Sequence, residues 1–200
     1  AVIGGTTNVA QGTYAIVAGG YFNNTDGESA CVIGGSQNLA QAWRAVVIGG
    51  TGNYAGGDNA AVVGGGLNQA IGTDAFIAGG SNNMASNFGS VALGSDNSVQ
   101  GDYSMSIGRS CSNSGNYTIA LGRSAQPINE GAHVFKDGAA TSVQSTADNQ
   151  LTLSYAGGIR LLFPTTQRLR KSGYAGSSNY VEEVHGSVST TGATPATSTI

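Results

Sequence analysis

The segment Ala30-Cys31-Val32-Ile33-Gly34-Gly35 is a short apolar run closed by two glycines. Runs of this kind recur through the first 122 residues, and their first glycines are spaced by 15 residues six times and then by 14 residues twice. These glycines are Gly4, Gly19, Gly34, Gly49, Gly64, Gly79, Gly94, Gly108 and Gly122. A period this regular predicts a repeat architecture, in which each short unit packs against its neighbours along one axis.

The residues that precede each of these glycines are mostly apolar and often β-branched. Two places before the glycine stand Val2, Val17, Val32, Val47, Val62, Ile77, Ala92, Ser106 and Ala120. Such runs favour short strands over helices, and consecutive apolar positions predict strands that are buried on both faces. One face can fill the interior of a coil, but no helices are present to cover the other. We therefore expect copies of the same chain to cover it in a cyclic homo-oligomer, although this argument does not fix the number of chains.

A polar arc follows each apolar run. Four places after the first glycine, six successive coils carry an asparagine: Asn8, Asn23, Asn38, Asn53, Asn68 and Asn83. Asparagine tolerates the left-handed conformation in turns, and identical asparagines stacked at one-strand spacing can form a hydrogen-bonded ladder. A second glycine marks a return turn in most coils. Each coil of 14–15 residues is thus predicted as strand, glycine turn, asparagine corner, short second strand and turn, which is typical of a two-sided β-roll.

The composition excludes several classes of protein. The 200 residues include 33 glycines and 10% charged residues, and the absence of a Gly-X-Y triplet excludes collagen. The net charge is −3 and no basic stripe precedes residue 131, so we expect no nucleic-acid partner. No apolar run approaches the roughly 20 residues that span a bilayer, so no membrane insertion is expected in this segment. The chain starts inside a repeat and is interpreted as a piece of a longer protein.

The two cysteines are predicted to lie far apart. Cys31 and Cys111 are separated by about five coils, or roughly 24 Å at about 4.8 Å per coil, which excludes a disulfide between them within one chain. Cys31 stands in an apolar strand position and is expected to be a small buried thiol, whereas Cys111 is placed in a turn. A bridge between chains is the alternative that the sequence leaves open.

The last coils of the repeat carry a known pattern. Gly-Gly becomes Gly94-Ser95, Gly108-Arg109 and Gly122-Arg123. The stretch from Ser90-Val91-Ala92-Leu93-Gly94 through Thr118-Ile119-Ala120-Leu121-Gly122 resembles the 14-residue head repeats of YadA-like trimeric adhesins, which are also found in phage and viral tail fibre proteins. The resemblance covers about residues 1–125. It implies a left-handed parallel β-roll, three chains wound side by side, and a role in attachment.

The period stops at Asn129, which suggests a division of the chain. Residues 1–128 are predicted as the β-roll head, 129–163 as a connector with a small β-hairpin cap around Gly157-Gly158, and 164–200 as a linker and the beginning of a further β domain. The hairpin resembles a cassette that follows such heads in phage and viral fibres. The predicted fold class is therefore all-β: a trimeric, left-handed parallel β-roll, a hairpin cap and the start of another β segment.

Motifs for catalysis or cofactor binding are not found in the sequence. There is no Gly-x-Ser-x-Gly elbow and no phosphate loop followed by Gly-Lys-Ser/Thr, and the segment Glu182-Glu183-Val184-His185 lacks the second histidine of a zinc-binding helix. We therefore expect no enzyme activity, cofactor or metal. The periodic glycines and asparagines are assigned a structural role. Large side chains interrupt the polar turns at Tyr21, Phe22, Trp43 and Arg44. These are the candidate surface-binding residues, because aromatics and arginine are favoured at binding hot spots and rings stack on sugars; the alternative is packing between chains.

Two functions fit these observations. The first is a structural or receptor-binding segment of a homotrimeric phage or viral tail fibre, extracellular and on the virion, that contacts a host cell-surface glycan or protein receptor and other fibre or particle proteins. The alternative is the head of a bacterial trimeric autotransporter adhesin at the bacterial cell surface, which binds matrix or cell-surface ligands. The neck, coiled-coil and barrel segments of such adhesins are not in this sequence. A solenoid lyase would need clustered acids on one strand face, and these columns offer Ala, Val and Ile.

Overall fold

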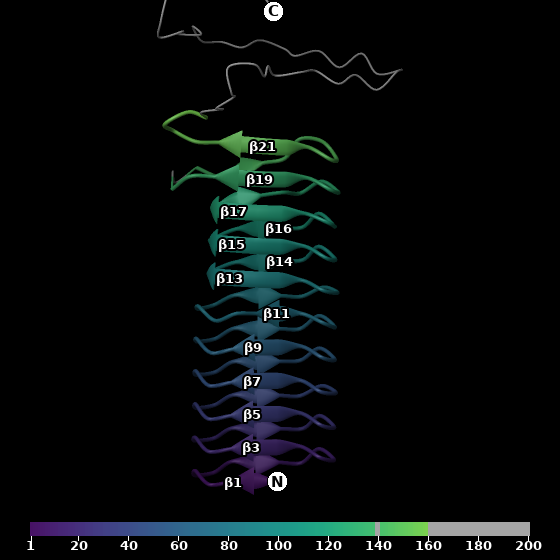
Figure 1. Ribbon diagram of the computed structural model, residues 1–200, viewed down its shortest axis with the longest axis vertical. Helices are drawn as coiled ribbons and strands as arrows, with labels where there is room; N and C mark the ends of the chain where they lie inside the picture. The colour runs from purple at the N-terminus through teal and green to yellow at the C-terminus, as the bar shows by residue number, and fades with distance from the viewer. Residues whose placement is uncertain (139–140, 160–200) are drawn as a thin grey trace, which may run out of the picture. The chain divides into compact units, whose positions relative to one another are not determined.

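In the computed structural model, which describes residues 1–138 and 141–159, short strands stack in parallel from one coil to the next (Figure 1). The first sheet contains one strand from each coil: β1 (Val2–Ile3), β3 (Ile16–Ala18), β5 (Cys31–Ile33), β7 (Val46–Ile48), β9 (Ala61–Val63), β11 (Phe76–Ile77), β13 (Val91–Ser95), β15 (Met105–Arg109), β17 (Ile119–Arg123), β19 (His133–Lys136) and β21 (Leu151–Ser154).

The second strand of each coil builds the other side of the roll. The second sheet contains β2 (Val9–Ala10), β4 (Asn24–Thr25), β6 (Leu39–Ala40), β8 (Tyr54–Ala55), β10 (Gln69–Ala70), β12 (Met84–Ala85), β14 (Ser98–Val99) and β16 (Ser112–Asn113). A short third sheet pairs β18 (Ala125–Gln126) with β20 (Val143–Gln144). The described residues contain no helix, so the prediction of an all-β parallel solenoid with coils of about 15 residues is confirmed.

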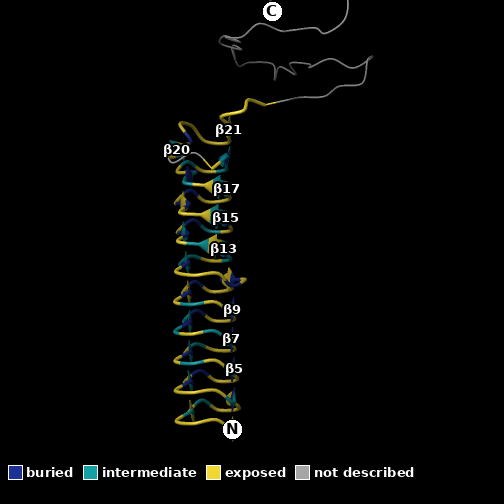
Figure 2. Ribbon diagram, turned by 90° about the vertical axis from the view of Figure 1, so that its left-hand side faces the viewer, coloured by how far each residue is buried: buried dark blue, intermediate teal, exposed yellow. Residues whose placement is uncertain are grey.

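The register of the sheets places equivalent residues of neighbouring coils side by side. Val32 of β5 lies between Val17 of β3 and Val47 of β7. All three side chains are fully buried, as is Ala40 on the opposing strand β6. Figure 2 shows the buried positions repeating up the stack of coils. The core is therefore a narrow column of small apolar side chains enclosed between the two sheets.

The asparagines form a continuous ladder at the corner of the roll. In the fourth coil, the backbone N–H of Asn53 donates to Oδ1 of Asn38 at 3.0 Å. Nδ2 of Asn53 donates to the carbonyls of Gly49 at 3.2 Å and Gly65 at 3.1 Å. Its own Oδ1 accepts from the N–H of Asn68 at 3.1 Å. Each asparagine thus binds its own turn and both neighbouring coils, which satisfies polar groups that are shielded from water.

The left-handed conformation lies one residue before the asparagine, which differs from the expectation for the asparagine itself. Phe22 has φ 55° and Leu67 has φ 57°, whereas Asn23 and Asn68 are not among the residues with positive φ. The asparagine side chain is fully engaged in the ladder, and the preceding residue makes the bend. This position is otherwise occupied by small or polar residues, for which the left-handed region is less costly.

The two positions of each Gly-Gly turn require glycine for different structural reasons. Both Gly34 and Gly35 adopt positive φ, at 67° and 80°. A Cβ on Gly34 would meet nothing within 4 Å, whereas a Cβ on Gly35 would overlap the carbonyl of Gly50 in the next coil. The first glycine therefore serves the backbone conformation alone, and the second also allows neighbouring coils to approach.

The change from 15 to 14 residues alters the strands of the first sheet. In the longer coils these strands have two or three residues, and an isolated bridge such as Tyr21 with Ser36 follows the Gly-Gly turn. From β13 to β17 the strands have five residues and run through a single glycine, with Gly94, Gly108 and Gly122 paired across the sheet. In the longer coils, the second glycine of the Gly-Gly turn is thus an extra residue between the strand and the isolated bridge that follows it.

Two strands continue the first sheet beyond residue 128. β19 pairs in parallel with β17, and β21 pairs in parallel with β19 in the register His133 to Leu151. The second strand of the hairpin expected around Gly157-Gly158 falls at residues 159–162, which lie almost wholly outside the described residues, as does the predicted linker and further β domain at 164–200. The domain boundaries remain predictions.

Candidate binding surfaces

The outward-facing side chains of the first sheet form one long apolar surface. Along each strand, the residue two places before the glycine points into the core, and its two neighbours point outward. On β5, for example, Val32 is fully buried whereas Ile33 is 47% exposed. We call the following exposed residues of the first sheet the apolar face: Ile3, Ile16, Ile33, Ile48, Val63, Phe76, Leu121, Leu151 and Leu153.

The outer surface of the second sheet has a different character. Its outward residues mix apolar side chains with amides and hydroxyls, namely Val9, Asn24, Leu39, Tyr54, Gln69, Met84, Ser98 and Ser112. The phenol of Tyr54 donates a hydrogen bond to Gln41 on this side. The apolar face has members on eight of the eleven strands of the first sheet, while the outer surface of the second sheet is mixed. Exposed apolar surface of this extent is typical of a face that takes part in an interaction.

Cys31 lies on the apolar side of the roll and is half-buried. The expectation of a buried thiol is therefore wrong for this single chain, because the side chain of Cys31 points outward between those of Ile16 and Val46 of neighbouring strands. Partial burial still raises the pKa of its thiol, since an apolar environment disfavours the thiolate.

Tyr21 and Phe22 lie on the edge formed by the turns that follow the first sheet, which we call the Gly-Gly edge. Their rings are in edge-to-face contact, with centroids 4.5 Å apart and planes at 88°. About half of each side chain is exposed. The pair is a small aromatic projection on a turn whose equivalents in neighbouring coils are polar.

Trp43 and Arg44 lie on the opposite edge, formed by the turns that lead from the second sheet back to the first. We call this the return edge. The guanidinium carbon of Arg44 lies 3.8 Å from the centroid of the Trp43 ring, in a cation–π contact. The backbone N–H of Trp43 donates to Oδ1 of Asp58 in the next coil at 3.2 Å. Because Tyr21 follows β3 and Trp43 follows β6, the fold does not bring the two candidate pairs into one site.

A third aromatic group lies further along the return edge and was not identified as a site from the sequence. Phe88, Tyr103 and Tyr117 come from three successive coils and are between 41% and 56% exposed. Phe88 packs edge-on against Tyr103 with centroids 5.1 Å apart, and Tyr103 stacks on Tyr117 at 5.6 Å with planes only 7° apart. The appearance of tyrosine before two consecutive strands at a 14-residue spacing was the available signal.

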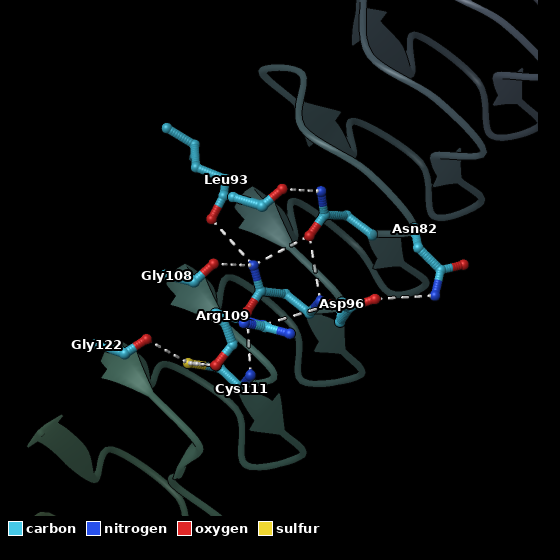
Figure 3. Close-up of polar contacts among 10 residues, drawn as sticks. Asn82, Leu93, Asp96, Gly108, Arg109, Cys111 and Gly122 are labelled. Atoms are coloured by element: carbon cyan, nitrogen blue, oxygen red, sulfur yellow. Dashed lines mark hydrogen bonds and ion pairs between the residues drawn. The ribbon is translucent and has the colours of Figure 1, made fainter. Parts of the chain in front are cut away.

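The asparagine ladder ends at a cysteine. Asn97 continues the ladder after Asn83, and the backbone N–H of Cys111 donates to its Oδ1 at 3.0 Å. The thiol lies 3.4 Å from the carbonyl of Gly122, in the place where an asparagine amide would donate (Figure 3). Cys111 is 1% exposed, and desolvation raises the pKa of its thiol despite opposing hydrogen bonds from the backbone.

Beside the end of the ladder, a polar cluster lies on the Gly-Gly edge. Nε of Arg109 lies 3.9 Å from a carboxylate oxygen of Asp96, whose other oxygen accepts from Nδ2 of Asn82 at 3.2 Å (Figure 3). Both charged side chains are exposed, that of Arg109 more than that of Asp96. Exposed pairs of this kind contribute little to stability, so we assign the cluster no binding role.

Across residues 1–138 and 141–159, no three His, Cys, Asp or Glu side chains gather in a way that could hold a metal ion. In the same part of the chain, no helix is long and apolar enough to cross a membrane. No protein-family model matches the chain, and no curated protein matches it in sequence.

Proposed function

We propose that this chain is a segment of a homo-oligomeric surface fibre that assembles through the apolar face and mediates attachment to a host cell. The observation that carries the proposal is the apolar face itself. Its side chains follow one sheet from β1 to β21, and many of them, such as Ile33 and Ile48, are more than 40% exposed in a single chain. Burial of such side chains contributes roughly 1.5–3 kcal/mol each, which favours association of identical faces.

The proposed oligomer is a trimer. A cyclic arrangement lets each chain turn its apolar face towards a common axis while the two edges and the second sheet remain outside. The number three comes from the resemblance of the 14-residue coils to the head repeats of YadA-like adhesins. The parallel solenoid with coils of about 15 residues is consistent with that resemblance.

The proposed location is extracellular, on a virion, with the fibre attaching a phage or virus to a glycan or protein receptor and joining other fibre or particle proteins. Repetition of one weak contact over three identical chains supplies avidity. The head of a bacterial trimeric adhesin at the bacterial cell surface is the second candidate, because the same repeats occur there. We propose no enzymatic activity, cofactor, nucleic-acid partner or membrane insertion for this segment.

The oligomeric state tests the proposal directly. Light scattering or sedimentation of the purified chain should give three times the mass of one chain, together with the circular dichroism of a β protein. The oligomer should then bind to cells or cell envelopes of its host more strongly than a monomeric variant. A chain that is monomeric while its β structure is intact would contradict assembly through the apolar face. The flanking sequence separates the two candidates: a coiled-coil stalk with a membrane anchor indicates the adhesin, and a particle-binding segment indicates the fibre.

A further inference from the structure

A histidine lies among the apolar side chains on the outward side of the first sheet. His133 of β19 pairs in register with Ile119 of β17 on one side and with Leu151 of β21 on the other. Its side chain is half-buried and points outward, because the neighbouring Val134 points into the core. Among the outward residues of this sheet, all of them on described strands, His133 is the one whose side-chain type ordinarily titrates between pH 5 and 8. The charge of the apolar side of the roll therefore depends on this side chain over that range.

The outward neighbours of His133 are apolar both across and along the strands. Phe135, the next outward residue of β19, lies between Leu121 of β17 and Leu153 of β21. Nδ1 of His133 is shielded from water and makes no hydrogen bond in the single chain. A buried polar atom without a partner calls for an explanation, and an imidazolium in such surroundings is disfavoured more strongly than a neutral ring.

Charged side chains near His133 lie at the two edges of the sheet. At the Gly-Gly edge, Arg123 of β17 donates to the carbonyl of Gly138 at 3.2 Å, and Asp137 accepts from the N–H of Ala156 at 2.5 Å. At the return edge, Glu130 and Asp148 are exposed and precede the strands that carry His133 and Leu151.

The other titratable groups near β19 do not share the outward face with His133. Tyr117 lies on the return edge, before β17, and Lys136 of β19 itself is buried on the core side. Strands β18 and β20, which also pack against β19, carry no titratable side chain. The apolar side chains of β17, β19 and β21 thus separate the imidazole from the carboxylates at both edges, and none of the printed hydrogen bonds joins it to one.

We infer that His133 makes assembly through the apolar face dependent on pH, so that the oligomer is stable with neutral imidazoles and is weakened when they are protonated. In a cyclic oligomer each chain brings its His133 to the same height of the roll. Acid then places one positive charge per chain in one layer of the interface, where each charge loses water and repels the others. Separated chains bind these protons more readily than assembled chains, so a lower pH favours separation. This inference rests on the proposed function and adds its regulation.

Thermal dissociation of the full chain at two pH values tests the inference. Light scattering follows the mass of the oligomer on heating, at one chain concentration, at about pH 7.5 and about pH 5.5. These values bracket the ordinary titration of histidine and stay above that of carboxylates. The dissociation temperature of the parent chain should be lower at the acidic pH by about 4 °C or more. His133→Leu continues the apolar row, so this variant should assemble and should lose most of that shift.

Two further variants serve as matched controls. His185→Gln removes the other histidine of the chain and should keep the full shift. Gln69→His in the His133→Leu background places a histidine on the outer surface of the second sheet and should not restore the shift. A parent oligomer with equal dissociation temperatures at the two pH values contradicts the inference alone, as does an equal shift in His133→Leu, or a shift lost in His185→Gln or restored by Gln69→His. A parent chain that is monomeric with intact β structure at about pH 7.5 contradicts the proposed function.

Discussion

The backbone N–H of Cys111 donates to Oδ1 of Asn97 at 3.0 Å, so the cysteine occupies the position that asparagine fills in the seven coils before it. The thiol in turn faces the carbonyl of Gly122 at 3.4 Å and accepts a hydrogen bond from the backbone of Ala125. A cysteine can therefore substitute for an asparagine here because the sulfur is both a weak donor and a weak acceptor.

Replacement of Cys111 should show whether this position needs a polar group. Cys111→Ala removes the partner of the Ala125 N–H and leaves a small void, and we expect a loss of about 1–3 kcal/mol in the free energy of unfolding. Cys111→Asn restores the pattern of the other coils and should be at least as stable as the parent chain. Denaturant unfolding followed by circular dichroism measures both, and equal losses in the two variants would show that the ladder pattern does not govern this site.

Interruption of the asparagine ladder at its centre should lower the free energy of unfolding more than removal of an exposed amide does. Asn53→Ala removes two donors to carbonyls and one acceptor from a buried site, so we expect a loss of about 2–4 kcal/mol in the free energy of unfolding. Asn59→Gly, in the same coil, removes an exposed bond of 3.0 Å to Asp74 and leaves the left-handed backbone at φ 56° free of strain, so it should change stability by less than about 1 kcal/mol. Similar losses in both variants would contradict a stabilising role for the ladder.

The two glycines of one turn should respond differently to the same substitution. Gly35→Ala places a Cβ against the carbonyl of Gly50, so the coils must separate locally. Gly34→Ala meets no neighbouring atom and costs about 1 kcal/mol for the left-handed backbone. We expect the melting temperature to fall clearly further for Gly35→Ala than for Gly34→Ala. The reverse order would show that backbone conformation, and not the approach of coils, decides the need for glycine.

Charges on the apolar face should dissociate the proposed oligomer without unfolding the chain. The double variant Ile33→Glu with Ile48→Glu places two carboxylates on side chains that are exposed in the single chain, so we expect a monomer with unchanged circular dichroism. Gln69→Glu, on the outer surface of the second sheet, should leave the oligomer intact. In the same samples a thiol reagent should label Cys31 slowly in the oligomer and quickly in the monomeric variant. Rapid labelling of Cys31 in the parent oligomer would place this face outside the interface.

The buried thiol predicts a loss of stability at alkaline pH. Burial raises the pKa of Cys111 above its ordinary value of 9.0, so the folded chain holds the proton more tightly than the unfolded chain does. The resulting stabilisation is fully present below pH 9 and is lost as pH rises through the folded-state pKa. Unfolding measured between pH 7 and 10.5 should show a steeper loss for the parent chain than for Cys111→Ala. Parallel curves would show that Cys111 does not titrate differently on folding.

The regular coils were predictable because identical residues recur at identical spacing. Apolar runs, paired glycines and the column of asparagines are each visible in the sequence as a period, and the parallel stacking follows from that period. The outward exposure of Cys31 was not predicted, because an apolar run does not reveal which alternate positions face the core.

The features that sequence reasoning missed lie where the period breaks. The shift to 14 residues moves Asn97 and Cys111 one place closer to the glycine, which conceals their part in the ladder. Similarly, Phe88 occupies the turn position before that of Tyr103, so their contact does not follow from aligned columns. Contacts of this kind depend on the three-dimensional path of the turn and not on spacing alone.

Because Val17, Val32 and Val47 stack in register, the length of the roll can change by whole coils. Because each coil contacts only the coils before and after it, removal of one complete 15-residue unit rejoins two surfaces that already match. Each such deletion would shorten the roll by one strand spacing, about 4.8 Å, and leave the edges and the outer surfaces in register. A gene encoding this protein can thus change the length of the roll by losing or duplicating a short segment of DNA, with no new interface to be evolved.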